Sequence, residues 1–341
     1  MNLDLHDQHS KALQKLWKPW RQAKIFITGG TGFFGKWLLE SHLWMHENIG
    51  LQTQLTILSR NPESFKKNYP QFVHPSITFV QGDIRDKLQL DQCFDLIIHG
   101  ATEASATLNR EDPLLMMDVI LQGTRNILDL AVATQANRFL MLSSGAVYGE
   151  QPQGMDYITE DYQGSPDPTN PLTAYGIAKR TAETLSFIYG RQHGFDSVSA
   201  RGFAFAGPYL PLDGEFAIGN FVGNALSGKP IEIKGDGQPM RSFLYGEDLA
   251  IWLWTLLLEG KKNEAYNLGS DQEISIYDLA KAVVKLSPQT TEILGPMQKP
   301  SGNFRNKYLP SIEKARSLGL EAWTTLDQSI QKTLEWNHDN L

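Results

Sequence analysis

The stretch KIFITGGTGFFG, residues 24–35, decides the fold expected for this chain. Residues 24–28 form a short run rich in apolar and β-branched side chains, which predicts a buried strand. Gly29, Gly32 and Gly35 follow it at intervals of three. The first permits a tight turn, the second lets a pyrophosphate approach the backbone, and the third lets a helix pack closely on the strand. The stretch therefore predicts a dinucleotide-binding turn with helix N–H groups facing a phosphate.

The same glycines also contain a second pattern, because residues 30–36 read G-x-x-x-x-G-K. A phosphate-transfer loop of that kind needs Ser or Thr at the next position to hold magnesium. The next residue here is Trp37. A kinase or NTPase site is therefore not expected.

Further strand-like runs follow the glycine turn and alternate with helix-like segments at 36–46 and 114–133. The runs are residues 55–58, 77–80, 95–99 and 138–142. This alternation predicts an α/β fold, a doubly wound parallel sheet of the Rossmann type with helices on both faces. After about residue 205 the rhythm breaks, so we expect a smaller C-terminal substrate-binding lobe.

Three segments follow from this pattern. Residues 1–22 form a helical lead, in which Leu13, Leu16, Trp17 and Trp20 share one face; we expect it to pack on the body rather than to bind a partner. Residues 23–205 form the dinucleotide-binding domain with the catalytic residues, and residues 206–341 mainly bind substrate. The chain is expected to end in a helical tail over residues 311–337.

Composition excludes several classes of protein. The 341 residues carry 31 Lys and Arg against 38 Asp and Glu, a net charge of −7, so a nucleic-acid partner is not expected. Cys93 is the only cysteine and no Cys/His cluster has zinc-site spacing, which predicts a reducing compartment and no metal site. The start is polar, and the most apolar stretch, residues 249–258, is far shorter than the ~20 residues of a membrane helix. We therefore expect a cytoplasmic protein without membrane contact.

Residues after the second and third strands bear on the cofactor. The second strand ends in Arg60 rather than in an acid, which suits a 2′-phosphate and slightly favours NADP over NAD. Asp83, after the third strand, is placed for an adenine edge, and a plain turn residue explains it equally well.

Tyr175 and Lys179 lie four residues apart in a segment of good helix formers, so both side chains project from one face. A phenol has a reference pKa of ~10, and a nearby ammonium together with a nicotinamide cation would favour the phenolate. A third group should hold the substrate oxygen beside Tyr175. Ser143 and Ser144, at the end of the fifth strand, both offer a hydroxyl there.

In these motifs the chain resembles the extended short-chain dehydrogenases/reductases of the sugar-nucleotide epimerase/dehydratase type. The resemblance covers residues 24–336. The resemblance rests also on GDIRD (82–86), HGAT (99–102), SSGAVYG (143–149), AGP (206–208), RSFLYGEDLA (241–250) and YNLGS (266–270). It implies an NAD(P)-dependent enzyme acting on a nucleoside-diphosphate sugar. It also implies a homodimer, formed through a four-helix interface from the helices near 114–133 and 173–191.

The resemblance further suggests roles for single residues. The catalytic residues are Ser144, Tyr175 and Lys179. The expected cofactor-binding residues are Gly29, Gly32, Phe33, Phe34, Gly35, Arg60, Asp83, Ile84, Ala101, Tyr175 and Lys179. The expected substrate-binding residues are Ser144, Gly145, Asn220 and Arg241, with the last two at the diphosphate.

The residues after Ser144 favour one reaction within this family. Dehydratases that resemble this chain place acids there and decarboxylating relatives keep a Glu nearby, whereas this chain has Gly145 and Ala146, which cannot move a proton. Small residues leave room for a keto sugar to rotate, so we predict a redox-neutral C4 epimerase working through a transient keto sugar. The alternatives are a 4-keto-sugar reductase, or a 4,6-dehydratase using Glu103 or Glu150. A dinucleotide-binding regulatory protein is less expected, because Tyr175 and Lys179 are both kept.

The pocket around the sugar is expected to differ from that of relatives. They commonly read R-x-x-N-x-Y-G-P near the sixth strand, where this chain has Ala204 and Ala206 in place of the Asn and the Tyr.

Overall fold

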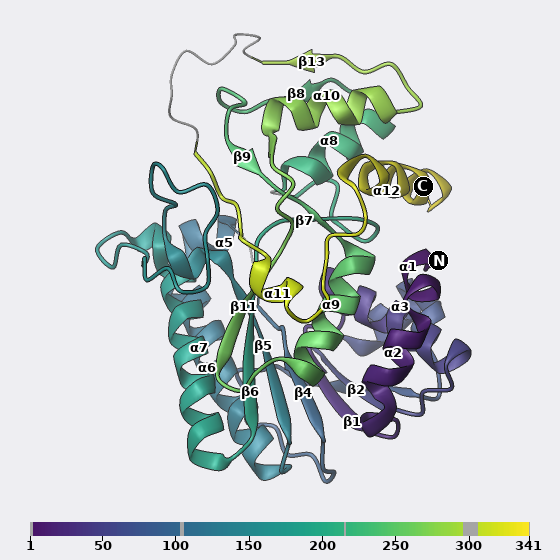
Figure 1. Ribbon diagram of the computed structural model, residues 1–341, viewed down its shortest axis with the longest axis vertical. Helices are drawn as coiled ribbons and strands as arrows, with labels where there is room; N and C mark the ends of the chain where they lie inside the picture. The colour runs from purple at the N-terminus through teal and green to yellow at the C-terminus, as the bar shows by residue number, and fades with distance from the viewer. Residues whose placement is uncertain (1–2, 103–105, 215, 296–305, 341) are drawn as a thin grey trace. The chain divides into compact units, whose positions relative to one another are not determined.

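The computed structural model describes residues 3–102, 106–214, 216–295 and 306–340 (Figure 1). The chain divides into two compact units, each made of several segments. The sheet unit comprises Met1–Gly149, Gly164–Gly202 and Leu249–Tyr266, and the second unit comprises Glu150–Gln163, Phe203–Asp248 and Asn267–Leu341. The expected segments were continuous, whereas these units are interleaved along the chain. The assignment of cofactor to one part and substrate to the other remains a prediction.

A seven-stranded sheet with the order β11-β6-β5-β4-β1-β2-β3 organises the sheet unit. Its strands are β1 (Lys24–Thr28), β2 (Gln54–Ser59), β3 (Ile77–Gln81), β4 (Leu96–His99), β5 (Arg138–Ser144), β6 (Asp196–Gly202) and β11 (Glu264–Leu268). Strands β1 to β6 pair in parallel. The chain leaves β3 and returns to β4 beside β1, so the strand order reverses there. The carboxyl ends of β1 and β4 flank this reversal, which is where ligands bind in such sheets.

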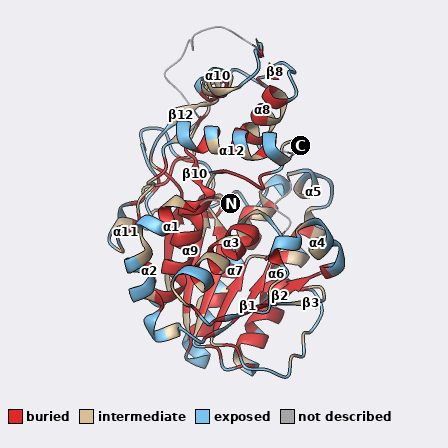
Figure 2. Ribbon diagram, turned by 90° about the vertical axis from the view of Figure 1, so that its right-hand side faces the viewer, coloured by how far each residue is buried: buried red, intermediate tan, exposed pale blue. Residues whose placement is uncertain are grey.

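Helices cover both faces of this sheet. Those of the sheet unit are α1 (Asp4–Gln8), α2 (Ser10–Trp17), α3 (Phe33–Asn48), α4 (Pro62–Asn68), α5 (Ala106–Glu111), α6 (Pro113–Ala133), α7 (Ala174–His193) and most of α9 (Gly246–Glu259), with 3-10 turns η1 (Lys18–Trp20), η2 (Pro70–Phe72), η3 (Gly145–Tyr148) and η4 (Pro171–Thr173). The strands are largely buried between these layers (Figure 2).

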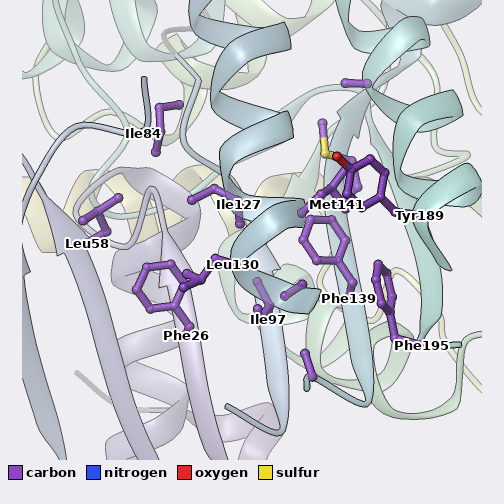
Figure 3. Packing of buried hydrophobic residues seen from close by; sticks show 14 of the residues in the cluster. Phe26, Leu58, Ile84, Ile97, Ile127, Leu130, Phe139, Met141, Tyr189 and Phe195 are labelled. Atoms are coloured by element: carbon purple, nitrogen blue, oxygen red, sulfur yellow. The ribbon is translucent and has the colours of Figure 1, made fainter. Parts of the chain in front are cut away.

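One hydrophobic cluster joins the sheet to α6 and α7. Phe26, Ile97 and Phe139 come from three strands and pack against residues of α6 such as Ile127 and Leu130 (Figure 3). Side chains alternate along a strand, so the neighbouring residues point to the opposite face. That face is also buried. A sheet buried on both sides explains why its strands read as continuous apolar runs.

The helical lead packs on the helices of the sheet unit. Trp17 of α2 is buried, and its ring meets that of Trp254 in α9 edge to face at 5.2 Å. The indole N–H of Trp254 donates to Ser41 of α3 at 3.0 Å, and His6 of α1 lies 2.6 Å from the same hydroxyl. Residues of α1 and α2 thus contact both α3 and α9.

The second unit contains short strand pairs and helices. Its elements are β7 (Phe205–Ala206), α8 (Ala217–Leu226), β8 (Ile231–Glu232), β9 (Met240–Arg241), β10 (Leu244–Tyr245), β12 (Ile274–Ser275), α10 (Ile276–Leu286), β13 (Ile293–Leu294), α11 (Glu313–Arg316) and α12 (Leu326–Asn340). The predicted continuous helical tail over 311–337 is wrong. The chain turns at Gly319, whose φ of +78° no helix accommodates, and a new helix begins at Leu326.

The fold class is confirmed: a parallel Rossmann-type sheet carries helices on both faces, with a second, smaller unit. Within the described ranges, no helix is both long enough and apolar enough to cross a bilayer. No group of three His, Cys, Asp or Glu residues that could hold a metal ion occurs in the described part of the chain. The cytoplasmic location stays a prediction.

Candidate active site

The turn after β1 requires glycine at two of the three expected positions. Gly29 has a φ of +75°, and a Cβ there would lie 2.6 Å from the backbone of Gly100. A Cβ at Gly35 would lie 2.2 Å from the backbone carbon of Gly30, so α3 could not pack this closely on the turn. Gly30 itself faces Ile57 of β2, where a Cβ would come within 2.6 Å. The sequence interpretation had given Gly30 no role.

Gly32 is different, because neither packing nor backbone conformation requires glycine there. Its φ is −84°, and a Cβ would meet the Gly29 carbonyl oxygen at an ordinary 3.5 Å. Gly32 is the N-cap residue of α3, so the first N–H groups of the helix, which have no acceptor within the helix, lie beside it. The glycine therefore leaves open a place where an external anion can approach the backbone.

A buried hydrogen-bond relay ties β1 to β4 beside this turn. The Thr28 hydroxyl accepts from the N–H groups of Gly100 and Ala101, at 3.2 and 3.1 Å. Its proton therefore points to His99 Nδ1, 2.8 Å away, which leaves the other ring nitrogen to donate to Thr124 of α6 at 3.1 Å. Burial lowers the pKa of His99 to about 3. The histidine is neutral and structural, and it fixes the loop that carries Ala101.

The three expected catalytic side chains come together in the sheet unit. Ser144 ends β5 and caps η3, where its Oγ accepts from the N–H of Ala146 at 3.1 Å. The Ser144 side chain is also hydrogen-bonded to Tyr175. Lys179 follows Tyr175 by one turn of α7, and its Nζ lies 5.9 Å from the centre of the tyrosine ring. Ser143, by contrast, is buried and its hydroxyl has no partner among the described residues.

The electrostatics of this group follow from burial. Burial raises the pKa of Tyr175, and the hydrogen bond from Ser144 opposes that rise because it favours the phenolate. Burial lowers the pKa of Lys179 to about 7, with the charge of Glu183 acting in the opposite direction. Lys179 Nζ donates to Thr102 Oγ1 at 2.8 Å and to the Leu142 carbonyl at 2.9 Å. The lysine is thus held in place and close to half-protonated at neutral pH.

Glu183 continues the same face of α7 and belongs to a buried ion pair. Arg201 of β6 donates to both of its carboxylate oxygens, at 3.0 Å from Nε and 2.8 Å from Nη2. A third donor of Arg201 reaches the hydroxyl of Tyr148 in η3 at 2.8 Å. This network joins the loop after Ser144 to the helix of Tyr175. The sequence interpretation missed it, although Glu183 stands four residues after Lys179 and that spacing was visible.

The expected cofactor residues around β2 and β3 lie at the same edge of the sheet. Arg60 is exposed after β2. The carboxylate of Asp83 accepts from Arg85 Nε and Nη2, at 3.1 and 2.9 Å. These bonds, and further the charge of Arg60, hold the pKa of Asp83 below its usual range, against the effect of burial. Asp83 therefore closes a local turn, while its contact with an adenine remains a prediction.

Some of the remaining expected cofactor residues are buried in the core, and others are partly exposed. Ile84 is buried, and its side chain fills the space that Gly123 of α6 leaves. Phe33 and Phe34 begin α3, are partly exposed and contact one another edge to face at 5.9 Å. None of these positions contradicts the predicted roles.

A family model covers the glycine turn, most of the sheet and helix α7. The model of the NAD-dependent epimerase/dehydratase family matches residues 25–269, from β1 to just past β11. The chain belongs to this family. The resemblance drawn from the motifs is confirmed, and so is the type of enzyme. The alternative of a regulatory protein without turnover is set aside.

One curated relative and two solved structures illustrate what the chain is similar to, the structures in their fold alone. UDP-glucuronic acid decarboxylase 6 of Arabidopsis thaliana is 30% identical over 312 residues, which cover 90% of this chain and 86% of the relative. An epimerase of Methanothermobacter thermautotrophicus has a TM-score of 0.80 at 24% identity and covers 96% of each chain. The UDP-glucose 4-epimerase of Thermotoga maritima, solved with UDP-glucose, has a TM-score of 0.76 at 22% identity, covering 93% of this chain and 99% of that one.

The expected substrate residues of this family member are divided between the two units. Gly145 is buried in η3, directly after Ser144. Asn220 lies in α8 and Arg241 in β9, both in the second unit. Arg241 is partly buried; it donates to the carbonyls of Met240 and Asn306, at 2.8 and 3.2 Å. Glu150 is exposed in the second unit, and Glu103 lies outside the described residues.

Proposed function

We propose that this enzyme is a redox-neutral C4 epimerase of a nucleoside-diphosphate sugar, with Ser144, Tyr175 and Lys179 as its catalytic residues. One observation carries the proposal: Ser144 is hydrogen-bonded to Tyr175 beside Lys179, while the next two positions, Gly145 and Ala146, have no ionisable side chain. The site can move the proton of a sugar hydroxyl. It lacks, at those two positions, a second acid or base for carbon chemistry.

The chain's own residues supply the proton transfer. Ser144 has one hydroxyl proton, which it can donate either to Tyr175 or to the sugar oxygen, so the serine links the two groups. Tyr175 accepts the hydroxyl proton as the phenolate, a form that the protonated Lys179 stabilises. The same phenol later returns the proton to the keto oxygen. A small loop at Gly145 and Ala146 leaves the keto sugar free to turn between these two steps.

The residues present fit a nicotinamide dinucleotide. A Cβ at Gly32 would be tolerated by the protein itself, so the glycine there is explained by a pyrophosphate next to the helix start. A bound nicotinamide would supply reversible hydride transfer at the carbinol carbon. Gly29 and Gly35 shape the turn, while Phe33, Phe34, Ala101 and Ile84 are the proposed neighbours of the dinucleotide.

Decarboxylation is a second candidate, because the relative from Arabidopsis named above is a UDP-glucuronic acid decarboxylase. A 4-keto sugar that bears a carboxylate on C5 is a β-keto acid, which loses carbon dioxide without a dedicated base. The Glu that decarboxylating relatives keep near the serine is absent here, since the position is taken by Gly145 or Ala146. This difference ranks epimerisation first.

The reaction is tested with a panel of UDP-, dTDP-, GDP- and CDP-sugars, including UDP-glucuronate, in deuterium oxide. Interconversion of C4 epimers without deuterium at carbon supports the proposal. Release of carbon dioxide with deuterium at C5 supports decarboxylation instead. Deuterium at C5 with loss of the 6-hydroxyl indicates dehydration, and a requirement for added NADPH indicates reduction. Either of the last two results would overturn both candidates.

The catalytic assignment is tested by Tyr175→Phe, which removes only the phenolic oxygen. We expect turnover to fall by about 10³-fold or more, the range of a general acid–base group. Tyr277→Phe in α10 is the matched control and should leave turnover unchanged. Full activity of Tyr175→Phe would show that the base has been misassigned.

We further propose a preference for NADP over NAD, supported by Arg60 at the end of β2 and by its charge acting on Asp83. A guanidinium matches the oxygens of a 2′-phosphate. Arg60→Ala should weaken NADP binding by about tenfold and leave NAD binding nearly unchanged, as measured by calorimetric titration. Equal loss for both cofactors would exclude the preference.

We also propose a homodimer through α6 and α7. Leu114 in α6 and Ile188 in α7 are large apolar side chains that are 75% and 44% exposed. An isologous four-helix contact would cover them. The double variant Leu114→Glu/Ile188→Glu should then be monomeric in analytical ultracentrifugation, whereas the wild-type protein should be dimeric.

A further inference from the structure

The start of helix α7 lacks a cap from its own sequence. The first N–H groups of any helix have no partner within the helix, and Tyr175 is only the second residue of α7. The N-cap residue, Thr173, makes no side-chain cap bond. Its hydroxyl donates instead to the carbonyls of Asp167 and Asn170, at 2.6 and 2.8 Å. The N–H of Tyr175 therefore needs a partner from elsewhere.

Asn109 of α5 supplies that partner from 66 positions earlier in the chain. Its Oδ1 accepts from the N–H of Tyr175 at 3.0 Å. Its Nδ2 donates to the carbonyl of Leu172 at 2.6 Å. One planar amide thus bridges the carbonyl of Leu172 in η4 and the N–H of Tyr175 in the first turn of α7. Rotation of either segment against the other would break one of the two bonds.

This contact bears directly on the geometry of the catalytic group. The side chain of Tyr175 must meet Ser144, which belongs to a different element, while Lys179 follows one turn later on α7. A shift of the first turn of α7 would move the phenol relative to the serine. The lysine would remain anchored at Thr102 and Leu142.

We propose that Asn109 is a positioning residue, which sets the first turn of α7 so that the phenol of Tyr175 faces Ser144. The inference rests on the proposed catalytic role of Tyr175. It differs from a purely structural role, in which loss of the amide would loosen the helix start and lower stability without changing the chemical step.

Asn109→Ala tests the inference against Asn170→Ala. Asn170 is the matched control because its Oδ1 also accepts a backbone N–H in this loop, that of Leu172 at 3.0 Å, without touching Tyr175. We expect Asn109→Ala to lower kcat about tenfold or more with KM changed less than about twofold, since small displacements of a reacting group are costly. Asn170→Ala should keep the wild-type kcat. Equal kcat for the two variants would overturn the inference.

A conservative variant separates the two bonds of the amide. Asn109→Asp keeps an acceptor for the N–H of Tyr175 and loses the donor to Leu172. It should retain more of kcat than Asn109→Ala, and the pH midpoint of kcat/KM should stay nearer the wild-type value. An equal loss of kcat in both variants would show that the bond to the Tyr175 N–H does not control kcat.

Two further measurements separate this inference from the proposed function. Hydrogen exchange of the Tyr175 amide, measured without substrate, should be faster in Asn109→Ala than in Asn170→Ala; equal rates count against the inference. If Tyr175→Phe were fully active, the proposed function would fail whatever Asn109 does. If Tyr175→Phe were inactive and the two asparagine variants equal, only the positioning role would fail.

Discussion

His99 and Lys179 are both fully buried ionisable residues near the carboxyl edge of the sheet, yet burial leaves them in different states. His99 ends β4, and burial lowers its pKa to about 3. Lys179 bonds to the carbonyl of Leu142 in β5, and its pKa falls only to about 7. The first residue is neutral at any physiological pH, whereas the second is poised to gain or lose a proton.

The pKa falls by a similar amount in both residues, so the ordinary values of the two groups, 6.5 for the imidazole and 10.5 for the amine, set the difference in charge state. His99 lies between two threonine hydroxyls, which satisfy a neutral ring and offer no countercharge. Lys179 lies one turn before Glu183, whose carboxylate favours the charged amine and is itself held by Arg201. Burial alone therefore does not mark a reactive group. The ordinary pKa of the buried group, together with the depth of its burial, decides its charge state at neutral pH.

The largest expected effect is a loss of turnover when the charge of Lys179 is removed. Lys179→Met keeps the length of the side chain and removes its charge, so Tyr175 loses the group that stabilises its phenolate. Turnover should fall by about 10³-fold. Lys281→Met in α10, at an exposed lysine, serves as the control and should keep wild-type turnover. Comparable turnover in the two variants would place Lys179 with His99, as a structural residue.

The next effect is expected on stability, when Arg201 loses the negative charge of Glu183. Glu183→Gln leaves the guanidinium of Arg201 buried without a full negative charge, which should cost about 3 kcal/mol of unfolding free energy in urea. Glu313→Gln removes a partner of the more exposed Arg316 and should cost less than about 1 kcal/mol. Equal costs would mean that the Glu183 pair is effectively solvated.

The two buried groups should also act in separate pH ranges. The pKa of His99 is depressed from 6.5 to about 3, so the unfolded chain binds more protons between these values and stability rises with pH there. The pKa of Lys179 is depressed from 10.5 to about 7, so stability rises again between about 7 and 10.5. At about 1.4 kcal/mol per pKa unit, each rise should amount to about 5 kcal/mol.

Thermal unfolding as a function of pH checks this expectation. His99→Gln should flatten the acidic rise only, and Lys179→Met should flatten the alkaline rise only. If Lys179→Met left the alkaline profile unchanged, the amine would titrate near its ordinary value in the folded protein, and the contrast with His99 would disappear.

The smallest expected effect concerns the turn after β1. Gly32→Ala should change the unfolding free energy by less than about 0.5 kcal/mol, because the new Cβ meets only ordinary contacts. It should nevertheless weaken dinucleotide binding by about tenfold, which fluorescence titration can measure. Gly214→Ala is the control, since its Cβ would also find its nearest neighbour at 3.5 Å. Unchanged cofactor affinity would mean that no phosphate approaches Gly32.

Local patterns predicted much of this fold because they reflect short-range physics. The strands and the helices α3, α6 and α7 were predicted from the apolar runs and the helix-like residue patterns within each segment, which do not depend on distant parts of the chain. The C-terminal tail failed because Gly319 was not recognised as a helix end. For the site, the four-residue spacing of Tyr175 and Lys179 fixes their common face, whatever the rest of the chain does.

The sequence by itself determined the glycine turn, the parallel sheet and the pair on α7, since each depends on residues a few positions apart. Only the tertiary structure decided that Ser144 rather than Ser143 meets Tyr175, that Thr102 anchors Lys179, and that Asn109 caps the helix of Tyr175. These contacts join residues 31 to 77 positions apart. Such pairs meet only after the sheet has brought the ends of β4 and β5 together, so no local pattern encodes them.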